Sequence, residues 1–428
     1  MKRINWKVVF SIAVIYFFAF ERVLVERSNV FSYADEIFAI VVIMWILFKL
    51  VVKKMKINDE DKMFFLTWTG VLILGVIGNI ASRLINNVYY IFIDALSMVK
   101  VWLAYYAIMF SNKDEKFYGS IIKNSARIAR GLVIVMFACL ILSQFINIGM
   151  SASIRHGIAS YKFIFNVPGN YSKLFYFIVP LLTADLFYKK TNYKKIIILI
   201  SLITWVATMR SRAFAFVAIY IFMYIAFLVL KPKFNKKEKK GKIPLLYVIP
   251  VIVIALVICW NQIIFYFTNP TQARSVLLRY SIVTAADYYP IGAGFGTFGS
   301  DIAAKNYSEL YKKYEFNKYY GMRENNTAYL NDNYWPMIIA QFGIKGAIMV
   351  AFALYVFTKK NISYTKTNQY FYISSICANG FLILSSVASK SYCEFSSICV
   401  FMLIGLLAKY EKKRQQKLVA KEESYEKE

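Results

Sequence analysis

The chain has 428 residues, of which 59% are hydrophobic and 18% aromatic, and its mean hydropathy is +0.48. Its apolar residues come in blocks of about 17–25, the length that crosses a bilayer, which excludes an ordinary soluble domain. The formal net charge of +28 falls mostly in short connections between these blocks, so it indicates membrane topology and argues against nucleic-acid binding.

The apolar blocks predict twelve membrane-spanning helices, since a chain in lipid must satisfy its backbone hydrogen bonds internally. In chain order they cover residues 7–25, 36–52, 63–80, 89–110, 131–148, 172–188, 196–209, 213–230, 243–267, 334–358, 369–389 and 395–408. We therefore predict an all-α polytopic membrane protein. It divides into spans one to nine (1–267), a long extracytoplasmic loop with short helices (268–333), spans ten to twelve (334–408) and a basic tail (409–428).

Lysine-rich connections predict the orientation of the chain. An even number of spans puts both termini on one side, and Lys53, Lys54 and the run Lys236–Lys242 lie on that side. Because basic connections favour the cytoplasm, we expect both termini to be cytoplasmic. The first span follows Lys2 and Arg3 without a small-residue cleavage site, so we expect it to stay in the cytoplasmic membrane as an anchor.

Arginine is distributed differently from lysine. Nine arginines fall on the predicted external side, namely Arg22, Arg27, Arg83, Arg155, Arg210, Arg212, Arg274, Arg279 and Arg323. Guanidinium groups bind phosphate in a bidentate manner, whereas lysine acts as a point charge. The pattern predicts an external ligand that carries phosphate. For Arg22, Arg27 and Arg83, contact with lipid headgroups is an equal alternative.

The external loop contains a glycine-rich run from Pro290 to Gly299, which includes Gly292, Gly294 and Gly296. Its spacing satisfies G-x-G-x-x-G, but a dinucleotide site needs a βαβ unit, and a loop between membrane spans does not provide one. Exposed N–H groups of these three glycines could bind an anion or approach a sugar closely. The alternative is a re-entrant turn packed on the helices.

A tyrosine-rich stretch follows the glycines. Tyr307, Leu310, Tyr311 and Tyr314 recur at helical spacing. We expect an interfacial helix at headgroup depth, with stacking on sugar rings as the alternative.

The order of these features resembles the O-antigen polymerase and ligase superfamily, most closely the Wzy-type capsule and exopolysaccharide polymerases. The likeness rests on Arg274, a helical pattern of about sixteen residues, the run Pro290–Phe298, the tyrosine-rich stretch, and Asp332-Asn333 ahead of Gly343. Upstream, Met209-Arg210-Ser211-Arg212 resembles the Ser-Arg motif of that family. The resemblance covers roughly residues 200–350.

The resemblance implies a GT-C-like glycosyltransferase that uses a polyprenyl-diphosphate-linked oligosaccharide outside the cytoplasmic membrane. Arg212 and Arg274 match the arginines expected to bind the diphosphate, with Arg210 and Arg279 in reserve and Asn333 beside the substrate. A flippase and a chain-length regulator are the partners expected with such an enzyme. The rival functions are a ligase on the same scaffold and a flippase for lipid-linked oligosaccharides.

Asp332 is the predicted general base. It stands where the ligases of the family carry a histidine, and a carboxylate there could accept the proton of an attacking sugar hydroxyl. Glu324 and Asp301 are weaker candidates. The alternative for Asp332 is an N-cap on the span that starts at Tyr334. No metal or cofactor is expected, because arginines can supply the positive charge and the donor carries its own energy.

Three charged residues fall inside predicted spans. Asp94 and Lys100 share a span but not one helical face, and Lys345 follows the external loop. Such charges are costly in lipid. We expect Asp94 and Lys100 to pair with other helices, and we expect Lys345 to pair or to extend towards the membrane surface.

Overall fold

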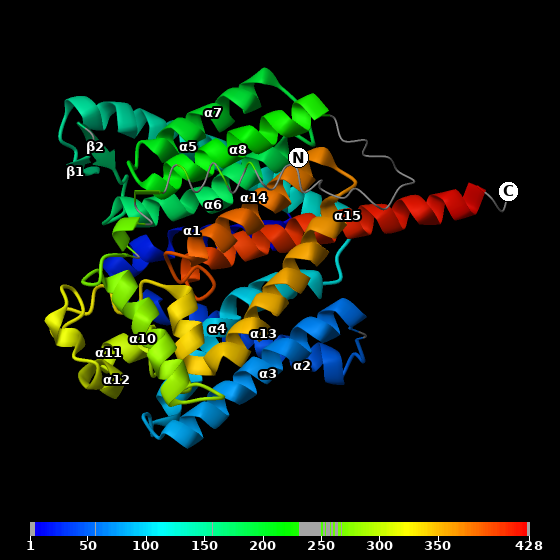
Figure 1. Cartoon of the computed structure of the whole chain (residues 1–428). Helices are drawn as coiled ribbons and strands as arrows, with labels where there is room; N and C mark the ends of the chain where they lie inside the picture. Colours follow the sequence, from blue (N-terminus) through cyan, green and yellow to red (C-terminus); the bar gives the residue numbers. More distant parts are fainter. Residues whose placement is uncertain are drawn as a thin grey trace.

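The computed structural model describes residues 5–425 except for positions 56, 156, 231–249, 251–252, 254–256, 258–259, 262–263 and 267. Within this part the chain is nearly all helical (Figure 1). Its one hairpin pairs β1 (Ser151–Arg155) with β2 (Ile158–Tyr161) in antiparallel register, with Ile154 opposite Ala159.

A helix overlaps every predicted span except 243–267, which lies largely outside the described residues. These helices are α1 (Trp6–Arg27), α2 (Ala34–Val51), α3 (Asp59–Ser82), α4 (Val88–Met109), α5 (Glu115–Phe145), α6 (Pro168–Asp185), α7 (Asn192–Val206), α8 (Ser211–Leu230), α13 (Tyr334–Thr365), α14 (Gln369–Ser386) and α15 (Ile398–Tyr425). Segment 268–333 carries α10 (Ala273–Asp287), α11 (Asp301–Lys305) and α12 (Glu309–Lys313).

Two helices run well beyond their predicted spans. Helix α5 begins at Glu115, where the Asp114 side chain caps it by accepting from Phe117 N at 3.0 Å. Helix α15 continues to Tyr425, because its Lys, Glu, Gln and Ala residues favour helix even after the apolar run has ended. The predicted basic tail is therefore helical as far as Tyr425.

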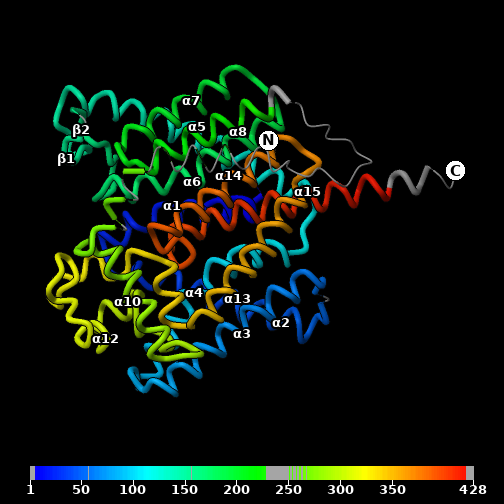
Figure 2. The backbone as a smooth tube through the Cα atoms, viewed as in Figure 1, coloured from blue at the N-terminus to red at the C-terminus, as the bar shows by residue number. Residues whose placement is uncertain are grey.

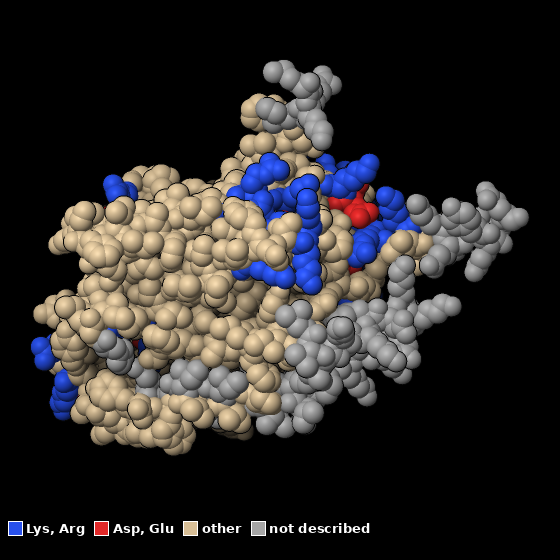
Figure 3. All heavy atoms as spheres, turned by 90° about the horizontal axis from the view of Figure 1, so that it is seen from above, with Lys and Arg blue, Asp and Glu red and all other residues tan. Residues whose placement is uncertain are grey.

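Among the described residues, five helices, α1, α3, α4, α5 and α13, are long and apolar enough to cross a membrane. Figure 3 shows a mostly uncharged surface between the two ends of the molecule, with Lys and Arg side chains gathered mainly at the end from which α15 projects. Both observations identify the chain as a helical membrane protein.

Different parts of the chain lie at the two ends of the helical bundle. Figure 2 shows the α2–α3 and α4–α5 connections and the end of α15 on one side, and the segment from α10 to α12 on the other. Helix α13 packs on α3 and α10, and α15 packs on α4. The first turns of α15 lie at the centre of the apolar core, since residues 398–408 are all buried.

The segment between α10 and α13 has a small core of its own. It includes Val276 and Leu277 from α10, together with Phe298, Phe316 and Leu330. Tyr307, Tyr311 and Tyr314 join this core, each with less than a tenth of its surface exposed. The prediction of an interfacial aromatic stripe is therefore wrong, because these rings pack inside the segment. The same burial excludes them as a platform for sugar.

Candidate functional site

Arg274 and Asp332 form an ion pair although 58 residues separate them. The Nε and Nη2 atoms of Arg274 donate to Asp332 Oδ2 at 3.0 and 2.8 Å. The guanidinium also lies over the ring of Tyr266, with 4.4 Å between Cζ and the ring centroid. Arg274 belongs to the first turn of α10, and Asp332 lies just before α13. Tertiary packing thus brings together two residues that were predicted separately from the sequence, Arg274 as a phosphate ligand and Asp332 as a general base.

Arg212 reaches the same place from α8. Its Nη1 atom lies 3.5 Å from the carbonyl oxygen of Ala388, and Nη2 of Arg274 lies 3.3 Å from that same oxygen. Both bonds are long and weak. One carbonyl in the α14–α15 connection therefore lies beside both guanidinium groups. Because these bonds are weak, the N–H groups of both arginines can turn to an anion instead.

Arg210 adds a third guanidinium group at the start of α8, where its carbonyl accepts from Ala213 N at 2.8 Å. Its Nε atom is buried and has no hydrogen-bond partner among the described residues. Burial, together with the positive charges of Arg155 and Arg212, lowers the pKa of Arg210. An anion would relieve that repulsion, and a helix N-terminus also favours negative charge.

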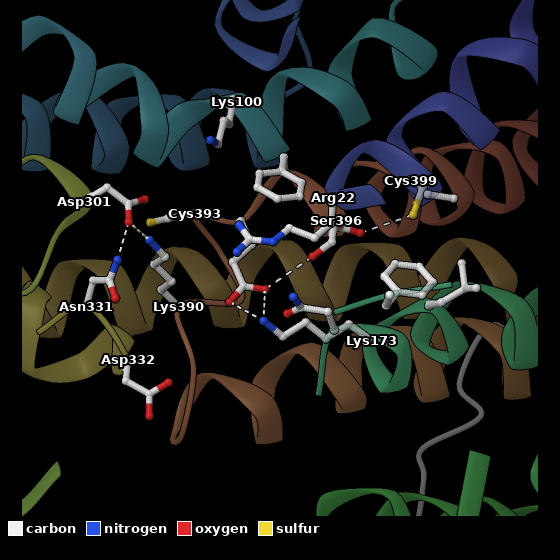
Figure 4. Close-up of a pocket in the computed structure, with 16 residues that line it drawn as sticks. Arg22, Lys100, Lys173, Asp301, Asn331, Asp332, Lys390, Cys393, Ser396 and Cys399 are labelled. Atoms are coloured by element: carbon white, nitrogen blue, oxygen red, sulfur yellow. Dashed lines mark hydrogen bonds and ion pairs between the residues drawn. The ribbon is translucent and has the colours of Figure 1, made fainter. Parts of the chain in front are cut away.

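A cavity of about 250 Å³ adjoins Asp332 (Figure 4). Two ion pairs lie in its wall: Lys390 with Asp301, and Lys173 with Glu394 at 2.7 Å. Burial alone would raise the pKa values of both carboxyl groups, but the lysines lower them. Both therefore stay ionised at neutral pH.

Asp301 is the second carboxylate in this wall. It also accepts a hydrogen bond from the Asn331 side chain, so a lysine and an amide both hold it. Asp301 has 64% of its side chain exposed and Asp332 has 35%, so exposure does not favour Asp332. Asp332 differs in its contact with Arg274, which also lies beside the carbonyl that Arg212 contacts. Glu324 is exposed and does not line the cavity.

Asn333, not Asp332, holds the N-cap position of α13. The alternative role of Asp332 as that cap is therefore wrong, because its carboxylate bonds Arg274.

Asn333 is 1% exposed, and neither polar atom of its amide has a partner in the part of the chain that the structure describes. A buried amide without partners is costly.

The glycine-rich turn is packed on the membrane helices. The N–H groups of Gly292, Gly294 and Gly296 donate to Tyr288 O, Gln341 O and Asp94 Oδ2 at 2.9, 2.9 and 2.6 Å, respectively. The predicted substrate-binding role of these glycines through free N–H groups is therefore wrong. The re-entrant turn, the alternative interpretation of the sequence, is what the structure contains.

The turn also fixes the neighbouring helix. Gly343 breaks α13 with φ 66° and ψ −176°, and its backbone lies directly against Gly292. On the other side, the Asn79 side chain of α3 exchanges hydrogen bonds with the N–H and carbonyl of Phe295 at 2.8 and 2.9 Å. These close approaches explain why glycine is needed here.

The intramembrane charges Asp94 and Lys100 pair with other elements, as predicted. Asp94 accepts from Gly296 N and from Gln341 Nε2 at 3.1 Å, and Lys100 forms an ion pair with Asp35 of α2. Lys345 is exposed, and its ammonium lies 6.0 Å from the ring centroid of Tyr289.

Arg279 is not part of the cluster. It donates to the Tyr319 hydroxyl at 3.0 Å on an exposed face of the segment. Conversely, the cavity wall contains three charged residues that were not predicted from the sequence: Lys173, Lys390 and Glu394. Lys390 and Glu394 lie in a short polar stretch between two apolar helices, a signal that could have identified them.

Among the described residues, no group of three or more His, Cys, Asp or Glu side chains could hold a metal ion. A scan against protein-family models gave no match for this chain, and a search of curated proteins gave none either.

Proposed function

We propose that the protein is a polysaccharide polymerase of the cytoplasmic membrane. It moves a glycan from its polyprenyl-diphosphate carrier onto a lipid-linked repeat unit at the outer face. The observation that carries the proposal is the meeting of Arg212 and Arg274 at one carbonyl, beside Asp332 and a cavity. Two cations and a carboxylate in this arrangement suit a reaction in which a phosphate leaves and a hydroxyl attacks.

The bond between the anomeric carbon and the phosphate oxygen breaks, and the diphosphate leaves with added negative charge. Arg212 and Arg274 stabilise that charge in a site partly shielded from water, where such contacts are strongest. The acceptor hydroxyl oxygen forms the new bond to the anomeric carbon. Its proton passes to Asp332, whose Oδ1 makes no hydrogen bond within the described residues.

The Arg274–Asp332 pair suggests how the site prepares for the reaction. Without substrate, the guanidinium and the carboxylate neutralise each other. Arg274 donates through Nε and Nη2 to a single oxygen of Asp332, whereas phosphate oxygens can accept from a guanidinium in two parallel bonds, so a diphosphate competes for it. Substrate binding therefore releases Asp332 from Arg274 at the moment when a base is needed.

The decisive experiment replaces Arg274 by Ala in cells, with Arg279→Ala as a matched control on the same helix. Loss of one charge-stabilising contact should slow transfer a hundredfold or more. Single repeat units should then accumulate on lipid at the outer face while the protein stays in the membrane. The control should give polymer of normal length, because Arg279 lies outside the cluster.

The same experiment separates the rival functions. Repeat units that remain on the cytoplasmic face would favour a flippase and contradict the polymerase. Long chains that form but stay unattached would favour a ligase. Normal polymer output from a variant lacking both Arg212 and Arg274 would exclude all roles for this cluster in transfer.

A further inference from the structure

A second cationic cavity lies at the opposite end of the bundle, where the lysine-rich connections are. It has a volume of about 480 Å³ and is lined by Lys49 and Lys53 from the end of α2 and the residues after it, and by Lys409 and Lys412 from α15. The ends of α3 and α4 complete the wall. It shares no lining residue with the cavity beside Asp332.

The four lysines of this cavity have no carboxylate partner among the described residues. Asp61 also lines the wall, but Lys360 and the Tyr106 hydroxyl already bind its carboxylate. Four like charges therefore face one cavity without compensation. Such an arrangement attracts an anion.

Two of these lysines are held in place by the end of α4. Lys49 Nζ donates to the carbonyl of Phe110 at 2.7 Å, and Lys409 Nζ donates to the carbonyl of Met109. The C-terminal carbonyls of a helix attract cations. An ammonium group has three donors, so each lysine keeps donors for a ligand while its position is fixed.

An apolar groove of about 630 Å³ adjoins the cationic cavity along the same helices. Its wall includes Ile46 and Leu50 of α2, Met63 and Leu66 of α3, and Leu103 of α4. Leu50 of the groove follows Lys49 of the cavity directly in α2, and Ile57 of the groove directly precedes Asn58 of the cavity, so the two are neighbours. A phosphate bound by the lysines would therefore place an attached hydrocarbon chain in the groove.

We propose that this cavity and groove bind an anionic phospholipid of the cytoplasmic leaflet, with the phosphate between Lys49 and Lys409 and one acyl chain between α2 and α3. Basic pockets between membrane helices on the cytoplasmic side are suited to such headgroups. The site does not depend on the proposed enzymatic function, since its residues are distinct from those of the outer cluster.

Lipid titrations of the full chain in a neutral detergent, followed by native mass spectrometry, test the proposal. The probes are dioleoyl phosphatidylglycerol and dioleoyl phosphatidylcholine, which have the same chains and differ in net charge. We expect the anionic lipid to bind about 30-fold more tightly, as two lysine contacts would give. The variant K49Q/K409Q should lose this preference. The control K189Q/K190Q removes two exposed lysines from the same end and should keep it.

A second variant leaves the charge unchanged. Thr69→Trp fills the groove, where Thr69 forms part of the wall. It should weaken binding of the dioleoyl lipid but not of phosphatidylglycerol with six-carbon chains. Because Thr69→Trp keeps all four lysines, it tests the proposal even if K49Q/K409Q does not fold.

Three results would overturn the proposal. The wild-type protein could bind both lipids equally. The control K189Q/K190Q could lose as much affinity as K49Q/K409Q, which would indicate bulk charge only. Inorganic phosphate could displace the lipid while Thr69→Trp had no effect, which would make free phosphate the ligand.

Discussion

The segment between α10 and α13 contains two regions that both suggest anion binding in sequence, and the structure treats them differently. At the cavity, one oxygen of Asp332 makes no hydrogen bond to any described residue, and Arg274 bonds only Asp332 and the Ala388 carbonyl within that part of the chain, contacts that a ligand can replace. In the glycine-rich turn, the N–H groups of Gly292, Gly294 and Gly296 are all bonded within the fold, and residues 292–300 are all buried. The difference shows that a donor-rich sequence forms a binding site only where the fold leaves its donors unused.

The largest expected effect is that of Asp332→Asn, which tests whether the cavity, in contrast to the glycine-rich turn, is the functional site. The amide keeps the shape of the carboxylate but cannot accept a proton at neutral pH, so transfer should slow by about 10²–10⁴-fold. Purified protein with a defined lipid-linked repeat unit, analysed as a gel ladder over time, measures the rate. Binding of the lipid-linked donor should persist.

The matched control is Asp287→Asn in the same segment. Asp287 forms an exposed ion pair with Lys313 at 2.7 Å and does not line the cavity. The Asp287→Asn variant should keep the rate of glycan transfer within about twofold of the wild type, because a surface ion pair contributes little. Near-normal polymer length from Asp332→Asn would remove this carboxylate as the base.

The second test concerns the turn. A Cβ at position 294 would overlap the backbone of Asn79, and Gly294 has φ +91°. Overpacking and backbone strain together should destabilise the protein by roughly 2–5 kcal/mol. Thermal unfolding in detergent should therefore show a lower Tm for Gly294→Ala.

Gly149→Ala provides the control for strain alone. Gly149 has φ +73°, yet no described residue lies within 4 Å of the position that an added Cβ would take, so only a cost of about 1 kcal/mol is expected. A Gly294→Ala protein with normal Tm and lost activity would contradict the packed turn and restore a role in substrate binding.

The sequence predicted the helices well because long apolar runs are what lipid requires. It also nominated Arg274 and Asp332, since few residue types can bind a diphosphate or accept a proton. It could not predict the kink at Gly343, which depends on the close approach of Gly292. Nor could it assign Lys173 to the cavity, because its partner Glu394 lies 221 residues away, in the connection before α15.

The smallest expected effect concerns that Lys173–Glu394 pair. Burial would raise the pKa of Glu394, but the charges of Lys173, Lys390 and Arg212 hold it below the ordinary 4.5. The lowered pKa in the folded state means that this carboxylate stabilises the protein above about pH 4.5 and that the contribution is lost as the pH falls further. Between pH 5 and pH 3, the wild-type Tm should therefore fall more steeply than that of Glu394→Gln.

Glu309→Gln is the control for that pH series, because Glu309 pairs with Lys312 one turn away on the exposed face of α12. Its curve should follow the wild type, since an exposed pair contributes little. If Glu394→Gln also follows the wild type, the cavity wall is hydrated in solution, and water screens the charges of Lys173 and Glu394. The outer cavity would then differ from the buried glycine-rich turn in hydration as well as in free donors, and the proposed diphosphate ligand would contact Arg212 and Arg274 in a more hydrated site than their packing indicates.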